Sequence, residues 1–220
     1  MKEKIKKYLP SFGRRGGRII KKSRRESLEE VLKEFGIDKN FAPQKTCKIF
    51  FEIGFGGGEH LAHRAEENPE KLFIGCEVYK DGVFKLARQI KEKNLTNIRI
   101  FSEDARELLE NLPSKSLDGI YLLFPDPWPK ARHHKRRIVT LDMLQLIAKK
   151  LKKNGKFNFA TDHEDYATWT LAQIYNSKLF RFLAKSKTDW LEPPLGHKKT
   201  RYQEKEKAGK PVFLNFELAN

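Results

Sequence analysis

The sequence predicts an α/β fold in which helices cover both faces of a mostly parallel sheet. Three observations lead to this prediction. Short apolar runs alternate with helix-like segments from residue 48 onward, a glycine-rich turn follows the first of these runs, and the 220 residues suffice to bury one sizeable core. We therefore expect a single domain over residues 26–220, preceded by a basic arm over residues 1–25.

Seven segments combine apolar, β-branched and aromatic residues as strands do. We expect strands at residues 48–53, 72–78, 98–102, 117–124, 156–160, 180–184 and 211–218. We expect helices at residues 59–67, 83–93, 105–109, 138–153 and 164–176. Because a helix separates each of the first five strands from the next, those five are predicted to run parallel. A long loop without a helical pattern joins the last two, so we expect them to pair antiparallel at the edge of a seven-stranded sheet.

The composition indicates a polyanionic partner. Lys and Arg number 45 against 29 for Asp and Glu, which gives a net charge of +16. Such an excess opposes folding because like charges repel, and it favours nucleic acid or an anionic membrane surface as a partner. The longest apolar runs, such as residues 120–124, are far shorter than the roughly 20 residues of a membrane-spanning helix. The two cysteines lie in apolar strand-like segments, which favours reduced thiols in a cytoplasmic protein.

The arm at residues 1–25 has too little apolar content to pack well, so we expect it to be mobile in the free protein. A solvated tail without a role is the alternative. Because the arm belongs to a chain that is basic elsewhere too, a nucleic-acid contact is favoured. Its basic residues include Arg14, Arg15, Arg18, Lys21, Lys22, Arg24 and Arg25.

A glycine-rich turn, EIGFGGG at residues 52–58, follows the first predicted strand. Gly54, Gly56 and Gly58 let the backbone turn tightly and approach a ligand closely. A dinucleotide-binding fingerprint has glycine at the next position, whereas this chain has Glu59, whose charge would repel a pyrophosphate at the helix entry. The turn therefore predicts a nucleoside cofactor without phosphates.

Carboxylates stand at the ends of the first four strands, where ligands bind in open α/β sheets. They are Glu52, Glu77, Asp104 and Asp126. In a basic chain, such a cluster suits a cationic ligand, and S-adenosylmethionine carries a sulfonium, an ammonium and a ribose diol. We expect Glu77 to bind the ribose hydroxyls and Asp104 to lie near the adenine. For each acid alone, and for Asp104 above all, a helix N-cap is the alternative.

A rigid Pro-Asp-Pro-Trp turn at residues 125–128 follows the fourth strand. The prolines fix φ and remove amide donors, so the Asp126 carboxylate has few local partners and faces a ligand. Trp128 either stacks on a base or forms a wall of the pocket. The basic run that follows predicts a grip on phosphates. It comprises Lys130, Arg132, His133, His134, Lys135, Arg136 and Arg137.

Further acceptor residues are expected after the fifth strand and before the last. Asp162 ends the fifth strand, and a polar and aromatic cluster precedes the last one. The cluster consists of Thr200, Arg201, Tyr202, Gln203 and Glu204. No Cys or other His lies near the histidine pair in sequence, so we expect no metal.

Together these motifs resemble the bacterial tRNA (guanine-N7)-methyltransferase family. The resemblance is carried by SFGRRGGR, EIGFGGG, the GCE of residues 75–77, Asp104-Ala105, FPDPWPKARHHKRRIV, Thr161-Asp162 and TRYQEK from Thr200. It implies the Rossmann-like fold of class I S-adenosylmethionine-dependent methyltransferases and methylation of guanine 46 in the tRNA variable loop. It also implies cofactor contacts for Glu52, Glu77, Asp104 and Asp126, and substrate contacts for Lys130, Asp162 and residues 200–203. The family turn usually ends in glutamate, whereas this chain has Gln203 followed by Glu204.

Asp126 is the predicted catalytic residue. Guanine N7 has a lone pair and no proton, so its methylation needs alignment and charge placement more than a base. A carboxylate stabilises the positive charge that develops on guanine, or accepts from the guanine N1 and N2 donors.

Two alternatives remain at this point. An exocyclic-amino methyltransferase acting on adenine or protein glutamine carries a neutral Asn-Pro-Pro-aromatic turn, where this chain has Asp126 and one proline before Trp128. A non-catalytic RNA-binding protein on the same fold is the other, and the intact acids at four strand ends argue against it. We expect tRNA as the partner and no obligatory protein partner.

Overall fold

The computed structural model describes residues 22–44, 46–186, 188–194, 196–199, 203 and 209–219. Its strands are β1 (Ile49–Ile53), β2 (Leu72–Cys76), β3 (Ile98–Phe101), β4 (Leu117–Leu123), β5 (Leu151–Thr161), β6 (Phe180–Phe182) and β7 (Val212–Leu218). Within the described residues they form one seven-stranded sheet in the order β3-β2-β1-β4-β5-β7-β6. Strands β1 to β5 pair in parallel, and β7 pairs antiparallel with both β5 and β6. The predicted α/β class and the antiparallel pairing of the last two strands are confirmed.

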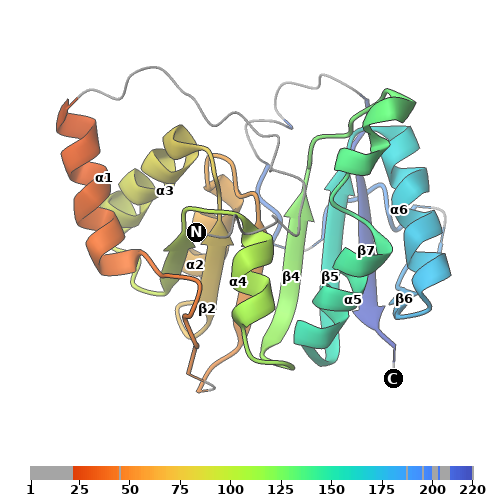
Figure 1. The fold of residues 1–220 in the computed structure, drawn as a ribbon, viewed down its shortest axis with the longest axis horizontal. Coiled ribbons are helices and arrows are strands. Elements are labelled where there is room, and N and C mark those ends of the chain that lie inside the picture. The colour runs from red at the N-terminus through yellow and green to blue at the C-terminus, as the bar shows by residue number, and fades with distance from the viewer. Residues whose placement is uncertain are drawn as a thin grey trace, which may run out of the picture.

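Helices cover both faces of this sheet (Figure 1). They are α1 (Lys22–Phe35), α2 (Glu59–Glu67), α3 (Lys80–Lys93), α4 (Ala105–Asn111), α5 (Leu141–Lys150) and α6 (Glu164–Ser177), and a short 3₁₀ helix, η1 (Ala131–Arg136), precedes α5. Helices α1 to α3 lie on one face, and α4 to α6 lie on the other. The sheet is therefore the middle of three layers.

Burial on both faces explains why the central strands read as apolar runs. Phe51 of β1 packs into the apolar cluster beneath α4 to α6, and Phe73 of β2 packs into the cluster beneath α1 to α3; both side chains are fully buried. Each large apolar side chain buried in this way contributes about 1.5–3 kcal/mol of transfer free energy. The two clusters fix the sheet and hence the loops at its edges.

Helix α1 was not predicted. Leu28, Val31 and Phe35 are buried at helical spacing, and the helix packs against α3. Lys91 Nζ of α3 donates to Glu30 Oε2 at 2.8 Å. The helix begins at Lys22 and so includes the last four residues of the predicted basic arm, while residues 1–21 lie outside the described part of the chain. The spacing of the apolar residues indicates a helix, but the basic residues directly before them led us to predict no helix here.

The predicted helix at residues 138–153 was too long at both ends. Thr140 caps α5, since its hydroxyl accepts the Met143 N–H at 3.2 Å. Leu151 leaves the helix and begins β5, where it pairs with Leu117 and is fully buried. Lysines surround Leu151 and fit a helix surface equally well, so this boundary is set by pairing with β4 and by burial.

The loops that follow the parallel strands are hydrogen-bonded to neighbouring strands at the carboxyl ends of those strands, which lie at the top of the sheet in Figure 1. Gly54 N–H donates to the Cys76 carbonyl at 2.8 Å, and Glu77 N–H donates to the Phe101 carbonyl at 3.1 Å. Phe124 N–H donates to the Ala160 carbonyl at 2.8 Å. Each hydrogen bond fixes a loop to the neighbouring strand, which places the predicted site residues along one edge.

No helix in the described part of the chain is both long enough and apolar enough to span a bilayer.

Candidate active site

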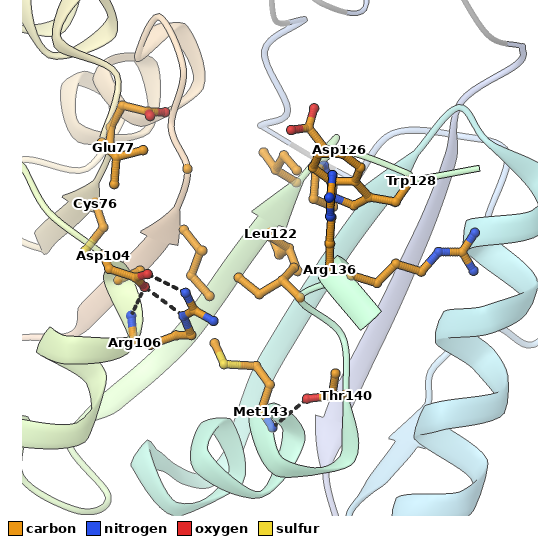
Figure 2. A pocket seen from close by; sticks show the side chains of 18 of the residues that line it. Cys76, Glu77, Asp104, Arg106, Leu122, Asp126, Trp128, Arg136, Thr140 and Met143 are labelled. Carbon is orange, nitrogen blue, oxygen red and sulfur yellow. Dashed lines mark hydrogen bonds and ion pairs between the residues drawn. The ribbon is translucent and has the colours of Figure 1, made fainter. Parts of the chain in front are cut away.

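A cavity of about 440 Å³ opens at the carboxyl ends of β1 to β4 (Figure 2). Gly54, Glu77, Asp104 and Asp126 line it, as does Trp128. These residues follow four different strands, and the sheet topology brings them together as the sequence predicted. The size is within the range typical of small-molecule sites.

Gly54 and Gly58 show why the first loop needs glycine. Both have left-handed backbone, with φ of +69° and +78°. A Cβ on Gly58 would lie 2.8 Å from the Leu86 side chain, so this glycine lets α3 approach the start of α2. A Cβ on Gly54 would meet nothing within 4 Å, so the space beyond it is open to a ligand. Gly56 and Gly58 shape the loop, and Gly54 borders the cavity.

The glycine loop holds Glu77 in place. Gly56 N–H donates to Glu77 Oε2 at 2.8 Å, and Tyr79 N–H donates to Glu77 Oε1 at 2.8 Å. Burial raises the pKa of Glu77, backbone hydrogen bonds from Tyr79, Gly56 and Val78 oppose that shift, and the charge of Asp126 adds to it. Each carboxylate oxygen keeps a second lone pair, so Glu77 can still accept from two hydroxyls.

Asp104 caps helix α4, which confirms the alternative that we gave for this residue. Its Oδ1 accepts from the Arg106 backbone N–H at 3.0 Å and from Arg106 Nε at 2.9 Å, and Arg106 Nη2 contacts Oδ2. Arg106 also lines the cavity and was not among the predicted site residues. The spacing Asp-x-Arg at a helix start was the available signal. The predicted contact of Asp104 with adenine stays a prediction.

Glu52 lies apart from the cavity lining. Its side chain points toward α2, is 2% exposed, and is hydrogen-bonded to His60 Nδ1 at 2.7 Å. The His60 ring lies edge-on to Tyr121, with centroids 4.9 Å apart. Glu52 thus forms a buried pair beneath the glycine loop, and its contact with a cofactor stays a prediction.

The turn that carries Asp126 is strained on both sides. Phe124 has φ of +51° and Trp128 has φ of +45°, which non-glycine residues rarely adopt and which costs on the order of 1 kcal/mol or more each. Asp126 and Glu77 lie on opposite sides of the cavity (Figure 2). Although the Asp126 residue is exposed, the cavity walls partly desolvate its carboxylate and raise its pKa.

Arg137 anchors this turn from below, and the prediction that it grips phosphate was wrong. It is 2% exposed, and its Nε donates to the Pro127 carbonyl at 2.9 Å. Its Nη2 pairs with Asp165 of α6, and its guanidinium lies 5.0 Å from the Tyr166 ring centroid and 5.1 Å from that of Trp169. Arg137 therefore joins the Pro-Asp-Pro-Trp turn to α6.

The rest of the basic run lies nearer the solvent. Lys130, Arg132 and Lys135 are exposed. The Arg136 guanidinium lies 4.8 Å from the Trp128 ring centroid and lines the cavity. Cationic side chains thus stand beside Asp126 at the opening of the cavity.

The predicted acceptor residues fall partly outside the described chain. Asp162 directly follows the end of β5, as expected. Gln203 Oε1 lies 2.7 Å from His197 Nε2, and the His197 ring contacts His60 and Phe213 with centroids 5.6 and 5.0 Å apart. Burial lowers the pKa of His197. His197, which contacts Gln203, was not among the predicted residues. Thr200, Arg201, Tyr202 and Glu204 lie outside the described residues.

The cavity chemistry suits a cationic nucleoside. Acidic side chains and apolar walls, Leu122 and Met143 among them, line it. The acidic residues are Glu77, Glu103, Asp104, Asp126 and Asp142, and the basic ones are Arg106, Lys135, Arg136 and Arg137, of which Arg106 pairs with Asp104 and Arg137 with Asp165. Ribose hydroxyls, an adenine amino group and an ammonium are all donors that carboxylates accept from. In the described residues no group of three or more His, Cys, Asp or Glu is placed to hold a metal ion.

Comparisons with known proteins agree with this geometry. A family model described as "Putative methyltransferase" matches residues 46–214. A tRNA (guanine-N(7)-)-methyltransferase of Hyphomonas neptunium is 39% identical, over 96% of this chain and 100% of its own. One of Agrobacterium fabrum is 42% identical, over 89% of this chain and 88% of its own. Among solved structures, an rRNA methylase from Streptococcus thermophilus has a TM-score of 0.54 and 12% identity, over 92% of this chain and 99% of its own, a likeness of fold.

Proposed function

The chain belongs to the tRNA (guanine-N7)-methyltransferase family, and on that premise we propose that it transfers a methyl group from S-adenosylmethionine to N7 of guanine 46 in the variable loop of tRNA. The observation that carries the proposal is the position of Asp126. This carboxylate stands opposite Glu77 across the cavity and beside a run of exposed cations. A cationic cofactor and an anionic RNA can thus meet at one residue.

The donor supplies an electrophilic methyl group on a sulfonium sulfur. The guanine N7 lone pair forms the new N–C bond as the C–S bond breaks, and the positive charge passes from sulfur to the guanine ring. N7 carries no proton, so no side chain has to remove one. Asp126 stays ionised and stabilises the charge at its new place, or accepts from N1 and N2 and so aims N7 at the methyl group.

Glu77 and Asp104 hold the nucleoside end of the cofactor in this proposal. Glu77 is fixed by two backbone N–H groups and accepts from the ribose hydroxyls. Asp104 is fixed by Arg106 and the start of α4, and lies near the adenine amino group. Leu122 and Met143 supply apolar walls that exclude water from the methyl group.

Cofactor affinity is expected to fall as the pH is lowered through a range above the ordinary carboxyl pKa. Glu77 accepts from both ribose hydroxyls, and Asp126 attracts the cationic part of the cofactor, only in the ionised form, and burial raises the pKa of both carboxyls. Protonation therefore begins at a higher pH than for solvated carboxyls, and binding of the cation releases protons. Calorimetry in buffers of different ionisation enthalpy measures this release. Glu77→Gln should bind more weakly and with less pH dependence, and an unchanged pH profile would exclude this role for Glu77.

tRNA binding is expected to depend on the exposed part of the basic run. Lys130→Gln combined with Arg132→Gln should weaken binding and reduce the slope of log K against log salt by about 0.7–0.9 for each phosphate that these side chains no longer neutralise. The matched control replaces Lys115 and Lys153 by Gln, because both are exposed at the opposite edge of the sheet. Equal slopes for the two double variants would show that the run does not contact phosphates.

Methyl transfer itself is tested with tritiated S-adenosylmethionine and unmodified tRNA. Label should appear on tRNA with guanine 46 and not on tRNA in which that guanine is changed to adenine. Borohydride reduction followed by aniline should then cleave the labelled tRNA at that nucleotide, which identifies N7. Label on both tRNAs would show that a nucleotide other than guanine 46 is methylated. Absence of label from a protein that still binds the cofactor would favour the non-catalytic RNA-binding alternative.

A further inference from the structure

A second cavity, of about 500 Å³, is lined by residues of α6 and β7 and by the turn between β5 and α6. Its exposed side chains are polar, namely Glu164, Thr168 and Lys210. Its less exposed ones are mostly apolar, with Leu171, Trp190 and Leu214 among them. A polar rim around an apolar interior suits a flat heterocycle with a polar edge.

Trp190 gives this cavity a fixed aromatic wall. Its ring stacks on Phe182, with centroids 5.8 Å apart and an interplanar angle of 18°. Its carbonyl accepts the Phe213 N–H at 2.7 Å, which holds the backbone against β7. The Trp190 side chain is therefore already ordered before a base stacks on it, so stacking costs little side-chain conformational entropy.

The cavity opens at the same sheet edge as Asp126. Asp162 follows β5 and Asp126 follows β4, and neighbouring strands lie about 4.8 Å apart. The Phe124 N–H bonds the Ala160 carbonyl, and the Phe124 ring contacts the Phe213 ring at 6.4 Å. An RNA strand with one nucleoside at Asp126 thus has the next unpaired nucleoside within reach of the second cavity.

The charges select a base over a phosphate. Two carboxylates, Asp162 and Glu164, line the cavity against one ammonium, that of Lys210. Carboxylates repel phosphate but accept from the amino and imino groups of a base. We propose that this cavity is a second nucleoside subsite, which holds an unpaired base flanking the methylated guanine, stacked on Trp190 and hydrogen-bonded through Asp162. The proposal rests on the proposed function, since it assumes an RNA substrate at Asp126.

A protein–RNA mutant cycle tests it. Two tRNA substrates are used. One has an abasic nucleotide directly before the target guanine, and the other has an abasic nucleotide directly after it. For the unchanged protein, one of these substrates should show a KM about tenfold higher than intact tRNA. Trp190→Ala should raise the KM of intact tRNA by a similar factor and should show no further loss with that abasic substrate. Trp190→Phe keeps an aromatic ring, so its KM for intact tRNA should stay close to that of the unchanged protein, and the abasic nucleotide should still raise that KM.

Two controls separate the outcomes. Thr168→Phe fills the cavity from an exposed position on α6 without removing Trp190, so it should reproduce the loss if Trp190→Ala fails to fold. The KM for S-adenosylmethionine should stay unchanged in all variants. The subsite would be overturned if the abasic nucleotide and Trp190→Ala raised the KM for tRNA additively, or if the KM were unchanged in both Trp190→Ala and Thr168→Phe. In either case, normal labelling of intact tRNA would still uphold the proposed function. Failure of the unchanged protein to label intact tRNA would reject the proposed function itself.

Discussion

Asp126→Ala will lower the rate of methyl transfer by about 100-fold or more, while tRNA binding stays close to that of the unchanged protein. Removing one preorganised electrostatic partner from a developing charge costs about 10²–10³ in turnover. Asp126 is poised for that role because flanking prolines remove amide donors and the cavity walls desolvate its carboxylate. Single-turnover kinetics with pre-bound tRNA measure the chemical step apart from binding.

Asp126→Asn separates the two ways in which this residue can act. The amide keeps the shape and one acceptor but loses the charge. If Asp126 stabilises the cationic guanine, Asn should be nearly as slow as Ala. If it mainly orients guanine through N1 and N2, Asn should be slower than Asp126 but clearly faster than Ala, because its amide oxygen still accepts from one of the two guanine donors. Normal turnover by Asp126→Ala would remove Asp126 from the reaction, whatever the behaviour of the Asn variant.

Much of the fold followed from local patterns. Strands β1 to β4 were placed to within about two residues, because buried parallel strands are apolar runs bounded by glycine, proline and charge. Once the order of strands and helices was known, the rule that ligands bind at carboxyl ends placed Glu77, Asp104 and Asp126 at one cavity. The start of β5 was not predicted, because Leu151 belongs to the strand through its pairing with Leu117, and these two residues are distant in sequence.

The wrong prediction for Arg137 and the absence of one for His197 have the same cause. Arg137 looked like one more cation in a basic run, and only the partners Asp165 and Tyr166 on α6 show that it is buried. His197 gave no signal because its contacts, His60 and Phe213, come from elements far away in sequence. Sequence patterns report periodicity and local turns, whereas tertiary partners decide which of several similar cations faces inward.

Arg137→Met should therefore destabilise the protein and slow methyl transfer, although Arg137 need not touch either substrate. The substitution leaves the Pro127 carbonyl without its donor and removes a cation from two aromatic rings, which together cost about 2–4 kcal/mol in the free energy of unfolding. Asp165 is half exposed, so water can replace its missing partner and its share of the cost is small. Urea unfolding monitored by tryptophan fluorescence measures the loss of stability.

The effect on turnover follows from the strain at Phe124 and Trp128. Their left-handed backbone persists because surrounding contacts hold it, and the Arg137 bond to Pro127 lies between them. Release of the turn should misplace Asp126 and lower turnover by about 10- to 100-fold. Arg137→Lys should restore little, because one ammonium cannot reproduce the planar fork that reaches Pro127 and Asp165 together. Asp165→Asn keeps the Pro127 bond and should retain most activity; an equally inactive Asp165→Asn would assign the effect to the ion pair instead of the turn.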